Sequence, residues 1–200
     1  MMPITQNEIN QIVARIVPIF QQVLNGYDFR KYPAADYARF KASFTALANP
    51  NNDIADAMIW KWGHWGKPNY PQRHQDLITE IQELWPQYVA SFNNNTSEQT
   101  FQWWREYLNR QTTYITVAYI THLVHHQEPL PIIDQHNFRA MNSLLGCVRP
   151  PARSKKKPSN WNDIIALKHF MTSIHAALPQ QTFSELDRFL MMYGRNYAAR

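Results

Sequence analysis

The spacing of the apolar residues is the feature that most constrains the fold of this chain, because they recur every three or four positions along most of its length. Near the N-terminus the pattern contains Ile9, Ile12 and Ile16, a spacing that places them on one helix face. Thr5 and Glu8 precede it with the spacing of a capping box, which favours a helix start. No segment alternates apolar and polar residues between hairpin turns. The sequence therefore predicts an all-α protein of eight or nine helices.

Proline, glycine and asparagine separate the predicted helices, since these residues end helices or favour turns. We expect helices at about 5–25, 33–48, 54–62, 71–92, 97–108, 112–126, 134–145, 160–178 and 182–198. Pro18 should kink the first of them. We expect residues 1–200 to form a single all-helical domain, in which residues 147–159 form an exposed basic, proline-rich loop between two helices.

Glycine is scarce in this chain, whereas aromatic residues are abundant: there are 5 Gly against 7 Trp, 10 Tyr and 10 Phe. No glycines fall in a G-x-G-x-x-G or Walker frame, so neither of these phosphate-binding loops is present. The single cysteine precludes an intrachain disulfide. The apolar stretches are too short to span a bilayer, and the N-terminus lacks the pattern of a secretory signal. We expect a cytoplasmic protein with no cofactor, metal or membrane partner.

Positive charge is concentrated in the C-terminal quarter of the chain. Residues 1–146 hold 11 Lys/Arg against 12 Asp/Glu, whereas residues 147–200 hold 9 against 3. The densest run, from Arg149 to Lys157, contains five cations interspersed with prolines. Such a run is either a solvated linker or a surface that attracts phosphates.

The best-defined local motif is the transition from an apolar helix through Pro129 and Pro131 to Asp134. Two prolines favour an extended connection, and Asp134 stands where the next helix would have its N-cap. A carboxylate at a helix N-terminus keeps its charge easily. Helix capping and a catalytic role beside a substrate are therefore compatible.

This motif resembles that of the helix-hairpin-helix DNA glycosylase superfamily, in which an apolar helix leads through a proline-containing turn to an Asp, often followed two residues later by His. Residues 131–140, with Asp134 and His136, match that element, and residues 116–146 follow its helix, turn and helix. The resemblance implies two helical lobes of the DNA glycosylase fold, DNA as the partner, and Asp134 as the catalytic residue at a flipped nucleotide.

The chain departs from that family just before the apolar helix. The family has a glycine hairpin there that binds a DNA phosphate, and its bifunctional members have a catalytic Lys, whereas residues 108–116 contain no Gly, Pro or Lys. The departure disfavours a lyase and leaves open a monofunctional glycosylase or a catalytically inactive relative. The candidate DNA contacts are Arg110, Arg139, Arg149, Arg153, Lys155, Lys156 and Lys157.

Two other groups of residues are candidates for ligand binding. Trp62 and Trp65 lie among Lys and His residues, a mixture that stacks on bases in single-strand binders, although core packing explains tryptophans as well. His122, His125 and His126 end an apolar helix, where imidazoles interact favourably with the helix dipole. Their spacing lacks the Glu of a zinc-protease helix, so a metal is not expected.

Two functions from different classes follow from these observations. The leading hypothesis is a DNA-binding, glycosylase-like protein with Asp134 in its pocket. The alternative is a non-catalytic helical module that binds another protein and whose basic loop is only solvated.

Overall fold

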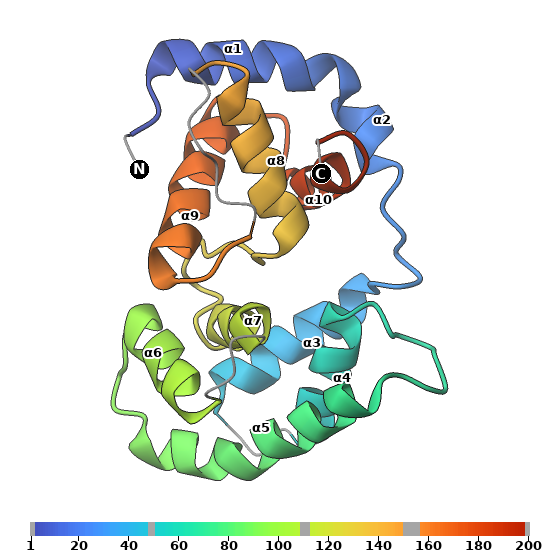
Figure 1. Ribbon diagram of the computed structural model, residues 1–200, viewed down its shortest axis with the longest axis vertical. Helices are drawn as coiled ribbons and strands as arrows, with labels where there is room; N and C mark the ends of the chain where they lie inside the picture. Colours follow the sequence, from blue (N-terminus) through green and yellow to red (C-terminus); the bar gives the residue numbers. More distant parts are fainter. Residues whose placement is uncertain (1–2, 48–50, 109–112, 150–156, 199–200) are drawn as a thin grey trace. The chain divides into compact units, whose positions relative to one another are not determined.

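The computed structural model describes residues 3–47, 51–108, 113–149 and 157–198. All regular structure within these ranges is helical, with no β-strand, so the predicted all-α class is confirmed (Figure 1). The first helical stretch is bent by a 3-10 turn that contains Pro18, as the position of that proline predicts. If this bent stretch is counted as one helix, the described residues form nine helices, within the predicted number.

The chain divides into two compact units. Unit 1 combines Met1–Tyr27 with Pro129–Arg200, and unit 2 is Asp28–Glu128. The chain therefore enters unit 2 once and returns to unit 1 through the proline-containing connection that precedes Asp134.

The described part of unit 1 contains five α-helices and one 3-10 turn. They are α1 (Gln6–Ile16), the 3-10 turn η1 (Val17–Ile19), α2 (Phe20–Leu24), α8 (Gln135–Gly146), α9 (Trp161–Ala176) and α10 (Phe183–Asn196). Thr5, Asp134, Asn160 and Thr182 form capping boxes at α1, α8, α9 and α10. These caps satisfy amide groups that the helices themselves cannot pair.

The closest helix approach in unit 1 is between α8 and α10. Gly194 of α10 lies so near α8 that a Cβ atom added to it would stand 1.8 Å from the carbonyl oxygen of His136. Only glycine permits this approach, because every other residue would place a carbon inside that oxygen. Phe189 of α10 also stacks on Phe20 of α2, with ring centroids 4.6 Å apart. Helix α10 is thus the element against which α8 and α2 are fixed.

Unit 2 is built around a helix that is buried on all sides. This helix, α7 (Tyr114–Val124), is apolar around its circumference, as expected for a helix inside a core. The others are α3 (Ala34–Thr45), α4 (Asn51–Lys61), α5 (Gln72–Ser91) and α6 (Ser97–Tyr107). Trp85, Tyr88 and Trp104 pack their rings together between α5 and α6. None of the described helices of either unit has the length and apolar character needed to cross a membrane.

Candidate functional site

Asp134 is the N-cap of α8. Its Oδ1 atom accepts hydrogen bonds from the amide groups of His136 at 2.6 Å and Asn137 at 2.9 Å. In return, the amide of Asp134 donates to Oδ1 of Asn137 at 2.8 Å. This reciprocal pair is a capping box, and it fixes the direction of the carboxylate relative to the helix axis.

Asn137 holds the cap in place and is a residue that the sequence motif did not single out. Its side chain is 1% exposed, and its amide nitrogen donates to the carbonyl of Ile132 at 2.7 Å and to Oδ1 of Asp187 at 3.4 Å. It therefore ties the connection before α8 to α10. The spacing of Asp and Asn three residues apart is the sequence signal that could have identified it.

The second carboxylate oxygen of Asp134 is not used by the cap. No described residue donates a hydrogen bond to Oδ2 of Asp134, and the side chain is half-buried. One oxygen is thus committed to the helix, while the other is available to a ligand. This arrangement is compatible with the predicted role of Asp134, and it is equally what a purely structural cap would have.

The charges of the protein are divided unequally between the two units. Unit 1 contains 11 Lys/Arg and 5 Asp/Glu, a net charge of +6, whereas unit 2 contains 9 and 10, a net charge of −1. The net positive charge of the chain is therefore a property of unit 1. A polyanion approaching the protein is attracted to this unit.

Three of the predicted DNA contacts can be located. Lys157 is exposed to solvent. Arg139 is half-buried and donates from Nη1 to the carbonyl of Gly194 at 3.2 Å. Arg149 is engaged within unit 1. The four other predicted contacts lie outside the described residues; they are Arg110, Arg153, Lys155 and Lys156.

Arg149 forms a two-point ion pair with Glu8. Its Nε and Nη2 atoms donate to the two carboxylate oxygens of Glu8 at 2.7 and 3.1 Å, and Nη2 also donates to the carbonyl of Pro3 at 3.0 Å. The hydrogen bond from Arg149, with that from the amide of Thr5, lowers the pKa of Glu8 to about 2. Arg149 therefore anchors the N-terminal segment, and Glu8 compensates the charge that it would offer to a phosphate.

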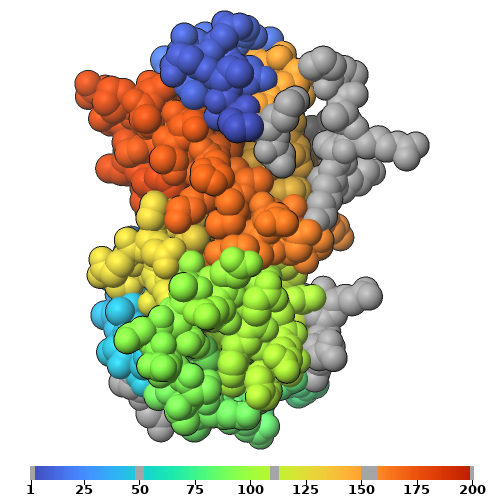
Figure 2. All heavy atoms as spheres, turned by 90° about the vertical axis from the view of Figure 1, so that its left-hand side faces the viewer, coloured from blue at the N-terminus to red at the C-terminus, as the bar shows by residue number. Residues whose placement is uncertain are grey.

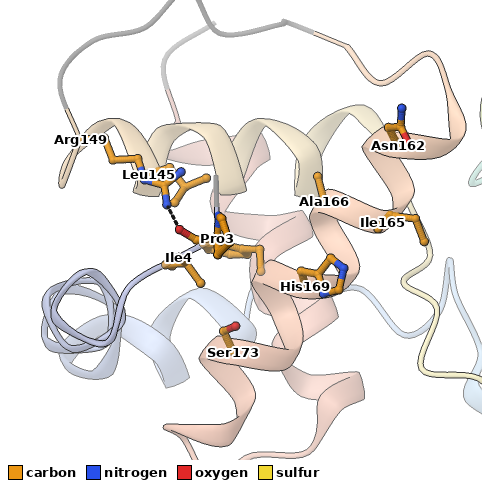
Figure 3. Close-up of a pocket in the computed structure, with 10 residues that line it drawn as sticks. Pro3, Ile4, Leu145, Arg149, Asn162, Ile165, Ala166, His169 and Ser173 are labelled. Carbon is orange, nitrogen blue, oxygen red and sulfur yellow. Dashed lines mark hydrogen bonds between the residues drawn. The ribbon is translucent and has the colours of Figure 1, made fainter. Parts of the chain in front are cut away.

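A groove of about 690 Å³ opens beside Arg149 in unit 1 (Figure 3). Its walls are the N-terminal segment, the end of α8 and one face of α9. The residues that line it are Pro3, Ile4, Leu145, Arg149, Asn162, Ile165, Ala166, His169, Phe170 and Ser173. Asp134 is not among them, so this groove does not bring Asp134 and Arg149 to one site.

The predicted base-stacking tryptophans pack against rings of unit 2. Trp62 lies against His74, with ring centroids 4.2 Å apart. Trp65 meets Phe40 edge to face, with centroids 6.2 Å apart. Both tryptophans are half-buried. Part of each ring is accessible to a base, while the rest contributes to packing.

The three histidines at the end of α7 do not converge on one point. Each pairs with a different hydroxyl group: His122 with Tyr37 and His126 with Thr45, both in α3, and His125 with Thr100 in α6. No group of three or more metal-ligating side chains occurs among the described residues. Hydrogen bonding within unit 2 therefore accounts for this histidine cluster.

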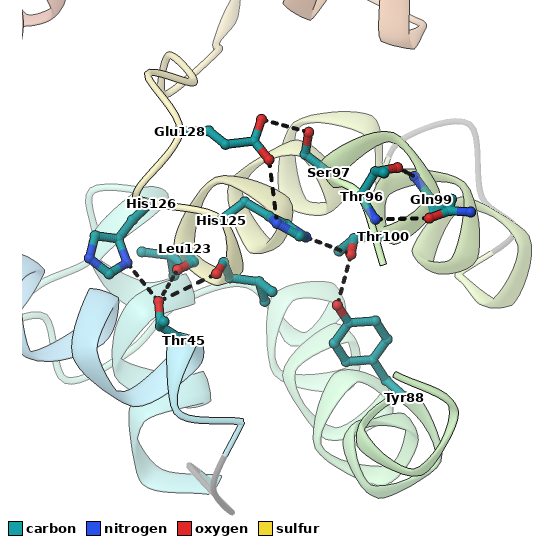
Figure 4. A network of polar contacts seen from close by, with 11 residues as sticks. Thr45, Tyr88, Thr96, Ser97, Gln99, Thr100, Leu123, His125, His126 and Glu128 are labelled. Atoms are coloured by element: carbon teal, nitrogen blue, oxygen red, sulfur yellow. Dashed lines mark hydrogen bonds and ion pairs between the residues drawn. The ribbon is translucent and has the colours of Figure 1, made fainter. Parts of the chain in front are cut away.

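One of these histidines belongs to an arrangement that resembles a catalytic triad (Figure 4). Nδ1 of His125 lies 3.6 Å from Glu128, and its Nε2 lies 2.8 Å from the hydroxyl of Thr100. However, Thr100 is 0% exposed, and its oxygen is also bonded to Tyr88 at 2.9 Å. Burial raises the pKa of Tyr88 to about 12 and lowers that of His125. Because no substrate can reach this hydroxyl, the network stabilises the packing of α5, α6 and α7.

Comparison with known proteins identifies no relative: no family model, no curated protein and no solved structure matches the chain significantly. The resemblance to the helix-hairpin-helix glycosylases thus rests on the residues around Asp134 and stays a prediction.

Proposed function

We propose that this protein binds DNA through unit 1 and that it is glycosylase-like, either a monofunctional glycosylase or a catalytically inactive relative. The separation of charge is the observation that carries the proposal, since unit 1 has a net charge of +6 and unit 2 of −1. A protein that neutralises DNA phosphates gains affinity by releasing counterions from the duplex. The glycosylase part is supported by the motif at Asp134 and by its Oδ2 atom, which accepts no hydrogen bond from any described residue.

DNA binding is tested by fluorescence anisotropy with short duplexes at several salt concentrations. We expect affinity to fall as salt rises. Combined replacement of Lys155, Lys156 and Lys157 by Gln should reduce the slope of log K against log salt by about 3.

The matched control removes three exposed cations from unit 2, through Lys31→Gln, Lys67→Gln and Arg73→Gln. It should leave the slope nearly unchanged. Absence of binding at low salt, or an equal loss of slope in both variants, contradicts the proposal.

The role of Asp134 is tested by Asp134→Asn. An Asn side chain still caps the helix through its oxygen, so the variant removes the charge and keeps the local structure. If the protein is a glycosylase, this variant should release no base from damaged duplexes while it binds them with unchanged affinity.

Asp163→Asn is the control for Asp134→Asn, because Asp163 is also a capping-box carboxylate of unit 1. It should keep both base release and DNA affinity. Equal base release by Asp134→Asn and by the unmodified protein would remove the catalytic role. Binding without base release from any duplex supports the inactive relative.

A further inference from the structure

The groove in unit 1 has a preformed wall. Pro3 and Ile4 belong to the segment before α1. This segment is held against the end of α8 by the ion pair of Arg149 with Glu8 and by the hydrogen bond from Arg149 to the carbonyl of Pro3, which Figure 3 shows. Figure 2 shows the N-terminal residues, in blue, beside α9, in orange. Since the pKa of Glu8 is lowered to about 2, this ion pair persists over the whole physiological pH range.

The inner surface of the groove is mainly aliphatic. Ile4, Leu145, Ile165 and Ala166 contribute to it, while the ring of Phe170 is 3% exposed and offers no open face. Unpaired bases bind chiefly by stacking on accessible aromatic rings. Aliphatic surfaces of this kind instead receive the apolar side chains of a peptide. This inner surface, the floor of the groove, therefore favours a peptide over a nucleotide as the ligand.

The rim of the groove is polar and, among the described residues, has no acidic one. Asn162, His169 and Ser173 follow one face of α9 at helical spacing. None of the ten residues that line the groove is Asp or Glu, and unit 1 as a whole has a net charge of +6. Glu8 compensates the charge of Arg149, and the net charge of +6 already includes this pair. The remaining positive charge of unit 1 favours a partner with acidic residues beside its apolar ones.

The wall of the groove also offers unpaired backbone groups. The amide and carbonyl of Ile4 make no hydrogen bond with any described residue, and Ile4 directly precedes Thr5, whose backbone is extended. An extended peptide lying along this segment can pair with these groups, as strands added to a free edge do.

We propose that this groove is a docking site for a short extended segment of a partner protein that contains both acidic and aliphatic residues. The aliphatic side chains enter between the N-terminal segment and α9, and the acidic ones lie toward His169 on the rim. This site is independent of DNA binding, because it recognises its ligand through an apolar floor that a duplex cannot enter.

The test is selection of random linear peptides displayed on phage against the full chain, followed by anisotropy titrations with the enriched peptides. Enriched sequences should combine Asp or Glu with Leu, Ile or Val. Their affinity should fall by about tenfold in Ala166→Trp, which fills the groove. Thr172→Trp, at an exposed position of α9 outside the groove, should bind them like the unmodified protein.

A second substitution tests the charge of the rim without adding bulk to the apolar floor. His169→Glu should reduce the affinity for acidic peptides by about threefold to tenfold. Thr172→Glu introduces the same side chain outside the groove and should have a smaller effect. Circular dichroism establishes that each variant keeps its helices.

Several results would overturn the docking site. The first is a selection in which no peptides that combine acidic and aliphatic residues are enriched. The second is an affinity for the enriched peptides that is the same in Ala166→Trp, His169→Glu and the unmodified protein. If Ala166→Trp reduces the affinity for a single-stranded oligonucleotide more than it reduces the affinity for the peptides, the groove is assigned to nucleic acid instead. Loss of DNA binding in the lysine variants, with peptide binding retained, would separate the two proposals.

Discussion

The two units are similar in length and differ in almost everything else. Unit 2 contains 18 of the 27 aromatic residues, including six of the seven tryptophans, and has a balanced charge. Unit 1 holds the excess positive charge, the groove and the capped aspartate. The comparison indicates that the two units have different roles: unit 2 gains stability from ring packing, and unit 1 presents the surfaces suited to anionic ligands.

The polar groups of unit 2 support this division. The three histidines at the end of α7 pair with hydroxyl groups, and the Thr100 hydroxyl of the triad-like network is buried. In unit 1, by contrast, Oδ2 of Asp134 and the backbone of Ile4 have no partner among the described residues. Hydrogen-bonding groups of this kind can fix the orientation of a ligand.

The largest expected effect is on the aromatic core of unit 2. Trp85 is 1% exposed and packs against Phe44, Tyr88 and Trp104. Trp85→Ala should lower the free energy of unfolding by about 3–5 kcal/mol, because it leaves a large cavity. Urea denaturation measures the loss. The half-buried Trp62→Ala is the comparison, and an equal loss there would contradict the role assigned to the ring core.

The next effect tests the helix contact that organises unit 1. Gly194→Ala should lower the free energy of unfolding by about 3 kcal/mol, because its Cβ meets the backbone oxygen of His136, which cannot move alone. Gly146→Ala is the matched control, since a Cβ there meets no atom within 4 Å, and it should be neutral or slightly stabilising. Equal effects of the two substitutions in urea denaturation would contradict the close approach of α8 and α10.

A smaller effect concerns the ion pair that forms the groove wall. Folding lowers the pKa of Glu8 from 4.5 to about 2, so its stabilising contribution is present above about pH 4.5 and is lost as the pH falls through 2. Glu8→Gln should therefore destabilise the protein at neutral pH and have little effect near pH 2. Unfolding midpoints across this range measure the difference. A deficit that is independent of pH would show that the ion pair does not contribute.

The smallest effect is expected at a histidine pair of unit 2. Nε2 of His64 lies 3.0 Å from Nδ1 of His74, so one proton serves both atoms. Desolvation, with Lys67 nearby, lowers the pKa of His64, and desolvation, with His64 and Arg73 nearby, lowers that of His74. Because the unfolded chain then binds protons more readily, stability should decline as the pH falls below about 6.5.

The measurement for this pair is stability between pH 7 and pH 5. His74→Phe keeps a ring against Trp62 and removes one titrating group, so the decline should become shallower. An unchanged decline would exclude the pair as its source.

Local chemistry made much of the fold predictable from the sequence. The capping boxes at Thr5 and Thr182 predict helix starts that agree with α1 and α10, and the structure places Asp134 at the predicted N-cap of α8. These signals can be recognised in the sequence because each involves residues only three positions apart. The same is true of the bend at Pro18.

Contacts between distant residues were not predictable in this way. Arg149 is 141 positions from Glu8, and nothing local to Arg149 indicates that its guanidinium is already engaged. The groove, likewise, is formed by three segments that meet only in the folded chain. The sequence shows in which part of the chain the positive charge is concentrated. It could not distinguish cations available to a ligand from Arg149, which holds the structure together.

The central claim is that unit 1 presents the DNA-binding charge, and lysine footprinting tests it most directly. Each unit contains four lysines: Lys31, Lys41, Lys61 and Lys67 in unit 2, and Lys155, Lys156, Lys157 and Lys168 in unit 1. Acetylation rates are measured by mass spectrometry with and without a short duplex at low salt. The account predicts protection of Lys155, Lys156 and Lys157, with the unit 2 lysines unchanged. Protection confined to unit 2, or equal protection of both units, would contradict it.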